Sequence, residues 1–431
     1  MSRLAGMLLA AMTIGAIGHG LWPILPSWPA GLCAWIAALL LAPRVSRPQL
    51  VQIGLLLVIA LMTIAGALLL DADIAWLRLL DTNVGLLSML AAISFLQLLP
   101  IRTGSPATDE RRGPVAYLKT LLSVAVFGGF INLSAMLLVA DRVARKSGLS
   151  AFAGQSITRA FSGCPCWSPF FAGMAVVLTY VPETGLLRVV ALGLPFAVVG
   201  LAVVFIEARL RHAGELADFE GYPLTVASLW LPCLLAAAVT FGHLLLPLAS
   251  VMVIIALAAL LVTVGVLAAS SGVAASARRL GSYVQHGLPA MVGELLLFLA
   301  AGVLAVGLRG LSTGMHLSLP FLRVFDFSAA ALLLAALILA SMLGAHPIIT
   351  ISVVVPLLAP LHPDPQLLAV TLLFGWGLGT CGGPLSGTHL VMQGRYGISS
   401  LKGAMRNWPY VLAMYPLALL FLFLAERFQT V

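Results

Sequence analysis

The stretch SGCPCWSPFFAG, residues 162–173, interrupts an otherwise apolar part of the chain. It places two cysteines around Pro165 and follows them with Pro169. Because proline removes a backbone donor and disrupts a helix interior, a helix that reaches this stretch ends there. Backbone groups released inside a bilayer find no water, so they must line a cavity or bind something else. In a membrane-spanning chain, this stretch predicts a broken helix.

The composition indicates that the chain does span a membrane. Of its 431 residues, 61% are hydrophobic and only 9% are charged, and the mean hydropathy is +1.09. A soluble protein of this size does not need so much apolar surface, so we expect an all-α polytopic membrane protein. The net charge of +8 does not indicate a nucleic-acid partner, because the basic residues lie in short loops between apolar runs.

Apolar runs long enough for a complete crossing occur nine times. They cover residues 4–20, 28–43, 50–70, 82–100, 187–208, 222–243, 248–268, 287–308 and 408–426. Two further segments, 117–146 and 320–362, are apolar at both ends and polar in the middle, which predicts re-entrant hairpins. Segments 150–182 and 365–394 predict broken helices that cross. The total is about eleven crossings and two hairpins.

The distribution of basic residues predicts the orientation. With the N-terminus inside, seventeen Lys and Arg residues fall in inside loops and five outside, with Arg159 left at membrane depth. Because Lys and Arg concentrate in cytoplasmic loops, the N-terminus is expected in the cytoplasm and the C-terminus outside. We expect a multi-pass protein of the inner (plasma) membrane.

The order of these segments repeats in inverted orientation. Residues 1–49 form a peripheral N-terminal pair, and 211–247 a connecting helix. Repeat 1 covers 50–210, with a scaffold at 50–100 and a hairpin and broken helix at 117–182. Repeat 2 covers 248–431, with a scaffold at 248–308 and a hairpin and broken helix at 320–394. Inverted repeats with interrupted helices at matching positions are typical of alternating-access transporters, and the interruptions indicate the binding site.

The architecture resembles the ion transporter superfamily, and within it the divalent anion–sodium symporters. Each hairpin tip of that family carries Ser-Asn-Thr. Here the first tip has Asn132 and Ser134, while the second has Thr350, Ser352 and Pro356 but no asparagine. The loops SGCPCWSP and GTCGGPLSGTH stand where the family has Pro-Pro-Asn. The chain is therefore similar to a distant branch, and the resemblance implies a scaffold domain, a mobile transport domain and a homodimer.

Tips and loops together predict two clusters of substrate- or ion-binding residues, since helix N-termini favour anions and freed carbonyls suit a cation such as Na⁺. The first cluster is Asn132, Ser134, Ser162, Gly163 and Cys164. The second is Thr350, Ser352, Thr380, Gly382, Gly383 and Ser386. For each hydroxyl the alternative is a bond to its own helix backbone.

Four titratable residues in or near these segments are candidates for function. Arg159 would pair with an anionic substrate or cap its own half-helix. Glu294 would carry a proton, form a scaffold hydrogen bond, or pair with Arg278 or Arg279. His346 and His389 would titrate near neutral pH or serve as structural donors.

Three cysteines support a different interpretation. Cys164, Cys166 and Cys381 would bind a soft ion such as Cu(I) if they converged, or would fill tight packing as small apolar residues. The absence of a His- or Met-rich segment favours packing, so we predict no resident metal.

The sequence thus predicts a secondary active transporter for a small organic or inorganic anion. Elevator-like alternating access would move the anion with Na⁺ or H⁺ as coupling ion, and no other cofactor is expected. A soft-metal permease is the alternative. An enzyme is not expected, because no catalytic constellation stands at membrane depth in the sequence. The expected partners are the substrate and the lipid bilayer, without nucleic acid.

Overall fold

The computed structural model describes residues 1–99, 112–145, 148–222, 229–315 and 324–427. Within these ranges every regular element is a helix, and one isolated β-bridge joins Arg112 to Glu220. The chain divides into two compact units, which are described separately. Unit 1 comprises residues 1–100, 233–319 and 352–360, and unit 2 comprises the rest.

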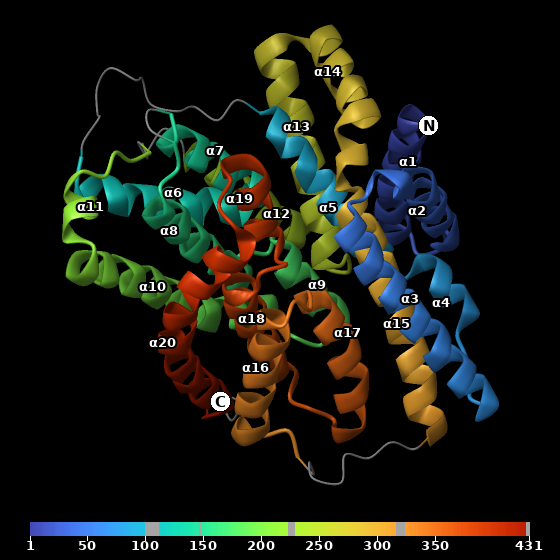
Figure 1. Ribbon diagram of the computed structural model, residues 1–431. Coiled ribbons are helices and arrows are strands. Elements are labelled where there is room, and N and C mark those ends of the chain that lie inside the picture. Colours follow the sequence, from blue (N-terminus) through green and yellow to red (C-terminus); the bar gives the residue numbers. More distant parts are fainter. Residues whose placement is uncertain (100–111, 146–147, 223–228, 316–323, 428–431) are drawn as a thin grey trace. The chain divides into compact units, whose positions relative to one another are not determined.

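Unit 1 is built from long apolar helices and short 3₁₀ turns. Its elements are α1 (Ser2–Leu21), α2 (Trp28–Leu41), η1 (Ala42–Arg44), α3 (Arg47–Leu69), α4 (Trp76–Asp81), α5 (Val84–Ser94), η2 (Phe95–Leu98), most of α12 (Trp230–Leu245), α13 (Val251–Ser271), α14 (Val273–His286), η5 (Leu288–Met291), α15 (Val292–Met315) and the C-terminal part of α17 (Pro347–Leu358) with η6 (Ala359–Leu361). Helices α3 and α15 run side by side (Figure 1).

Unit 2 holds the interrupted helices. Its elements are α6 (Pro114–Ile131), α7 (Leu133–Val143), α8 (Ala151–Ser162), η3 (Cys164–Cys166), α9 (Ala172–Tyr180), α10 (Leu186–Arg211), α11 (Ala213–Ala217), α16 (Phe327–Met342), the first residues of α17, α18 (Pro365–Gly382), α19 (Gly387–Tyr396) and α20 (Ser400–Arg427). Helix α18 packs against α16, α10 and α20, so it is central to this unit.

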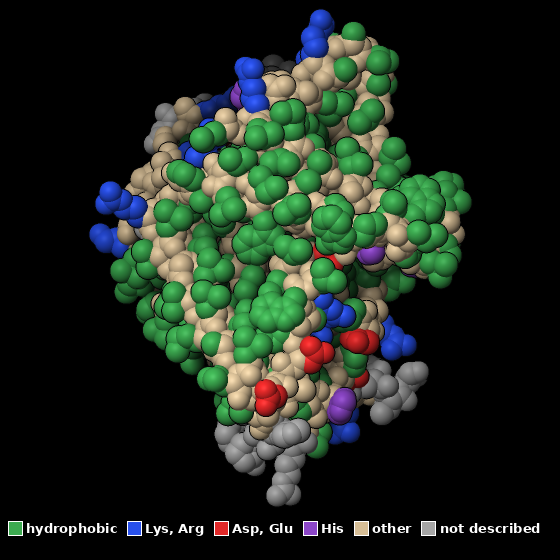
Figure 2. Space-filling model, turned by 90° about the vertical axis from the view of Figure 1, so that its right-hand side faces the viewer, with side chains coloured by type: hydrophobic (Ala, Val, Ile, Leu, Met, Phe, Trp, Pro, Cys, Tyr) green, Lys and Arg blue, Asp and Glu red, His purple; other side chains and the backbone are tan. Residues whose placement is uncertain are grey.

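The helices confirm the predicted fold class. Within the described ranges, nine helical stretches are long and apolar enough to cross a membrane, and four shorter apolar helices accompany them. Figure 2 shows a face on which hydrophobic side chains cover much of the surface, as lipid contact requires. The starts of the predicted span 222–243 and hairpin 320–362 fall partly on residues outside the described ranges. Helix α14 was not among the predicted segments. Its sequence is polar and only Ser276 is buried, so apolar patterning does not predict it.

Both broken helices are flanked by residues that favour the start or the end of a helix. The Ser150 hydroxyl accepts the Ala153 N–H at the start of α8, and the Asp364 carboxylate accepts the Leu367 N–H at the start of α18. Helix α8 ends before Gly163 and Pro165, and α18 ends before Gly383 and Pro384. The breaks thus fall inside SGCPCWSP and GTCGGPLSG, as predicted.

The hairpin tips are tight turns. Between α6 and α7 the whole turn is Asn132, a non-glycine residue with φ of 54°. Between α16 and α17 the turn runs through Gly344, whose φ is 101°. The ψ of Asn132 is −144°, which lies outside the left-handed helical region that asparagine tolerates, so the backbone of this turn is strained.

Candidate functional site

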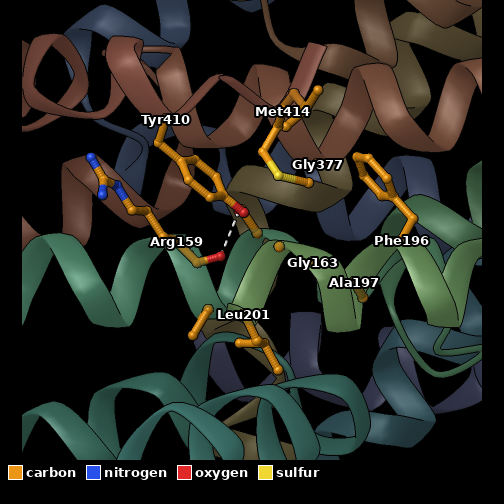
Figure 3. Close-up of a pocket in the computed structure, with 12 residues that line it drawn as sticks. Arg159, Gly163, Phe196, Ala197, Leu201, Gly377, Tyr410 and Met414 are labelled. Carbon is orange, nitrogen blue, oxygen red and sulfur yellow. Dashed lines mark hydrogen bonds between the residues drawn. The ribbon is translucent and has the colours of Figure 1, made fainter. Parts of the chain in front are cut away.

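A buried guanidinium lies at the end of the first half-helix. Arg159 is in the last turn of α8, and its side chain is 4% exposed. Its Nη1 pairs with Glu207 Oε2 of α10 at 2.6 Å, its Nε donates to Asn407 Oδ1 at 3.0 Å, and its Nη2 donates to a carbonyl oxygen of α20 at 3.0 Å. The guanidinium also lies 5.0 Å from the ring centre of Tyr410 (Figure 3). Arg159 is therefore held by α10 and α20 rather than by the end of its own helix.

The second break is joined to the same network. Asn407 is fully buried, and its Nδ2 donates to the carbonyl oxygen of Cys381 at 3.1 Å. His389 Nε2 lies 2.9 Å from that oxygen, so this nitrogen carries the proton. Trp408 Nε1 donates to the carbonyl oxygen of Gly382 at 3.1 Å. The carbonyls freed at the end of α18 are thus satisfied by side chains of α19 and α20, as a membrane interior demands.

The ends of the two broken helices touch directly. A Cβ on Gly377 of α18 would lie 2.6 Å from the carbonyl oxygen of Ser162, the last residue of α8. Glycine is needed here because any side chain would force the two helices apart. The two interruptions, more than 200 residues apart in the sequence, therefore meet inside unit 2.

A small cavity of about 10 Å³ lies beside this contact, which is room for about one water molecule. Its polar lining comes from three residues, Arg159, Ser162 and Tyr410. Figure 3 shows Phe196, Ala197 and Met414 at its apolar side. Residues that carry a guanidinium and two hydroxyl groups thus lie on one side of the cavity and apolar residues on the other, and Figure 3 shows the guanidinium of Arg159 directed away from Phe196 and Met414.

The first predicted cluster is partly assembled. Asn132 Nδ2 donates to the carbonyl oxygen of Phe170 at 3.2 Å, which brings the first tip onto the loop after the break. Among the described residues, Asn132 Oδ1 is buried without a hydrogen-bond partner. Ser162 donates to the carbonyl oxygen of Arg159 at 2.8 Å, the backbone bond that was its alternative. Ser134 is half-buried, and Gly163 lines the cavity.

The second predicted cluster consists largely of local bonds. Thr350 donates to the carbonyl oxygen of Pro347 at 2.8 Å, within its own helix. Ser386 accepts the backbone N–H of His389 as the N-cap of α19. Ser352 is buried but belongs to unit 1. Thr380 is half-buried, and Gly382 and Gly383 are buried at the end of α18.

The two histidines have different surroundings. His346 accepts the Ile348 N–H on Nδ1 at 3.3 Å and meets the ring of Trp376 edge-on at 5.7 Å. His389 is 3% exposed and holds the end of α18, as described above. His389 thus serves as a structural donor, the alternative to titration, whereas His346 serves as an acceptor, and titration of either histidine stays a prediction.

The three cysteines do not form the cluster that the soft-metal interpretation requires. Cys164 Sγ contacts the carbonyl oxygen of Ala125 at 3.4 Å, whereas Cys166 Sγ contacts that of Leu373 at 3.7 Å. Cys381 is buried near the end of α18. The described part of the chain contains no group of three or more His, Cys, Asp or Glu side chains that could hold a metal ion. Cys164 and Cys166 are thus directed to the backbones of different helices, α6 and α18, and the buried thiols fill space between helices.

Glu294 lies in the first turn of α15 in unit 1 and is exposed at the surface. No ion pair joins it to Arg278 or Arg279 in the described structure. Its role as a proton carrier stays a prediction, as does the assignment of the inverted repeats.

Sequence reasoning did not identify Glu207, Asn407 or Tyr410. Glu207 directly follows an uncharged run from Val189 to Ile206. An acidic residue at the end of an apolar span is a functional candidate, so the sequence did contain a signal for Glu207. Asn407 and Tyr410 stand at the head of the last apolar run and carry no comparable signal, because nothing local indicates a partner.

The chain is an all-α, multi-pass membrane protein. No protein-family model and no curated protein matches its sequence. Among solved structures, it is similar to the YdaH transporter of Alcanivorax borkumensis, with 15% sequence identity and a TM-score of 0.43. The similarity covers 85% of this chain and 83% of the other.

Proposed function

We propose that this protein is a secondary active transporter that moves a small organic or inorganic anion across the membrane. The observation that carries the proposal is the meeting of two interrupted helices at one buried guanidinium. The contact between Gly377 and Ser162, and the bonds of Asn407 to both sides, bring Arg159 and both helix ends into one place.

A buried charge in a membrane protein is a functional candidate because its desolvation is costly. Arg159 supplies hydrogen-bond donors in a fixed fork that suits a carboxylate or an oxyanion. The adjoining cavity is too small for an organic anion in this conformation. Substrate entry would therefore require the surrounding helices to separate, as alternating access provides.

The division of the chain into two compact units supports an elevator-like mechanism. Unit 2 contains both broken helices and would act as the transport domain, while unit 1 would act as the scaffold. The expected setting is the inner (plasma) membrane, with the N-terminus in the cytoplasm and a homodimer as the assembly. The coupling ion would be Na⁺ or H⁺. The unpartnered oxygen of Asn132 supports a cation at the first tip.

The test is uptake of radiolabelled anions into proteoliposomes, with propionate, succinate, phosphate and sulfate as the panel and imposed Na⁺ or pH gradients. Saturable uptake above that of protein-free liposomes is expected for at least one anion. Arg159→Gln alone would leave Glu207 unpaired, so the informative variant is the double Arg159→Gln, Glu207→Gln, which removes both charges. We expect it to lose tenfold or more in affinity, from the loss of about 1.5–3 kcal/mol of charge-assisted bonding.

The matched control is Arg188→Gln, which removes an exposed arginine near the start of α10 and should transport as the wild type does. Two results would overturn the proposal. One is the absence of saturable uptake for every anion of the panel. The other is unchanged affinity in the double variant.

A further inference from the structure

The ion pair between Arg159 and Glu207 is asymmetric. The Arg159 side chain is 4% exposed, whereas that of Glu207 is 19% exposed. The other two acceptors of the guanidinium, Asn407 Oδ1 and the carbonyl oxygen of Arg406, are neutral. Among the described residues, Glu207 is therefore the single anion paired with Arg159. It is also the more exposed member of the pair.

The titratable groups around Glu207 are few. On the helices packed against α10, Arg159 comes from α8, Tyr117 from α6 and Tyr410 from α20, and each interacts electrostatically with the carboxylate or with its partner. Helix α18 contributes Cys381 and η3 contributes Cys166, both near Tyr410. The acid of α11, Glu215, is exposed and pairs with His212. Among these groups, Arg159 is the cation that pairs with Glu207.

An anionic substrate that binds Arg159 would compete with the Glu207 carboxylate for the same position. The Nη1–H that Glu207 accepts is the strongest donor of the site, because the bond is short and both groups are charged. A carboxylate or oxyanion that takes this donor must displace Glu207. A carboxyl group that loses its cation in apolar surroundings is more stable in its protonated form.

We propose that Glu207 is the proton-coupling residue of the transporter. An anion displaces the Glu207 carboxylate from Arg159, and the released carboxylate takes one proton from water, so that one anion and one H⁺ are bound together. When the anion leaves, Glu207 gives up the proton and pairs with Arg159 again. The inference rests on the proposed anion transport and assigns its coupling to H⁺ through Glu207 rather than through Glu294.

Two properties of the structure fit this exchange. Glu207 lies one turn before the end of α10, at Arg211, the end that the distribution of basic residues assigns to the cytoplasm. The proton therefore has a short path to water. The exchange also preserves net charge at the site, because an anion and a proton enter together and Arg159 always has one anionic partner.

The experiment measures proton uptake during binding. Propionate is the probe, since its two aliphatic carbons and carboxylate reproduce the Glu side chain from Cβ onward. Phosphate and sulfate form the other arms. Purified full-length protein in weakly buffered detergent solution is mixed with each anion, a pH-sensitive dye reports proton uptake, and calorimetry gives the affinity between pH 5.5 and 8. The variants are Glu207→Gln, which keeps an acceptor for Arg159, and Glu215→Gln as the matched exposed control.

For the wild type and Glu215→Gln, we expect uptake of about one proton per bound anion and an affinity that rises about tenfold per pH unit of acidification, as one linked proton requires. Glu207→Gln should bind without proton uptake and with an affinity that does not depend on pH. Wild-type binding without proton uptake would by itself overturn the inference. A Glu207→Gln protein that keeps the pH dependence would also overturn it, and so would one that folds but no longer binds. Absence of binding for every anion in every protein would instead overturn the proposed anion site.

Discussion

The amide oxygen of Asn407 accepts the Nε–H of Arg159 at 3.0 Å. The nitrogen of the same amide donates to the carbonyl oxygen of Cys381 at 3.1 Å. One side chain of α20 therefore bridges the ends of both broken helices. Because an amide offers a donor and an acceptor at once, it can serve a cation and a freed carbonyl together.

Asn407→Ala should lower the stability of the folded protein by about 1–3 kcal/mol, since it leaves a buried donor of Arg159 without its acceptor. The measurement is the thermal unfolding midpoint in detergent, followed by tryptophan fluorescence. Gln155→Ala is the control, because the side-chain amide of Gln155 also donates a hydrogen bond to α20, but that bond is exposed. Equal midpoints for the two variants would contradict the bridging role.

Gly193→Ala should be strongly destabilising. A Cβ at this position of α10 would lie 1.8 Å from the backbone carbonyl oxygen of Cys166. The backbone of η3 would have to shift, and overpacking of this kind costs about 1–3 kcal/mol or more. Gly394→Ala is the matched control in α19, since no atom lies within 4 Å of its added Cβ. It should be neutral or stabilising by up to about 1 kcal/mol. A Gly193→Ala protein as stable as Gly394→Ala would show that α10 does not pack on the first break as described.

The cysteines should not bind a soft metal. Titration with Cu(I) against a chromophoric chelator should give equally low, substoichiometric binding for the wild type and for the triple variant Cys164→Ala, Cys166→Ala, Cys381→Ala. The reason is geometric, because the thiols of Cys164 and Cys166 contact backbone oxygens of different helices. Binding of one Cu(I) per chain that disappears in the triple variant would restore the metal interpretation.

The topology is tested by labelling single cysteines in a cysteine-free background with a membrane-impermeant maleimide. Ser46, Arg145 and Lys402 should react from the cytoplasmic side, and Asp73 and Glu183 from the outside. All except Lys402 lie between helices, and Arg145 directly follows the hairpin of α6 and α7. Reaction of Arg145→Cys from the outside alone would mean that α6 and α7 do not form a re-entrant hairpin.

The sequence by itself determined the fold class and the positions of the interruptions. Hydropathy over about 20 residues indicates whether a helix lies in lipid or in water. Pro165 and Pro384, each next to glycine-containing sequence, favour the end of a helix. These are local effects, so they can be seen before the fold is known. The same local chemistry indicated that Arg159 stands at membrane depth.

The tertiary structure decided which groups pair. Glu207 and Asn407 come from helices 48 and 248 residues away from Arg159 in the sequence, and no local pattern specifies contacts over such separations. The same holds for the three cysteines, for which the sequence favoured packing over a shared site but could not say which helices Cys164 and Cys166 contact. Apolar periodicity tells which face of a helix is buried, but the partner of a buried polar group depends on how whole helices cross, because hydrogen bonds require distances near 3 Å.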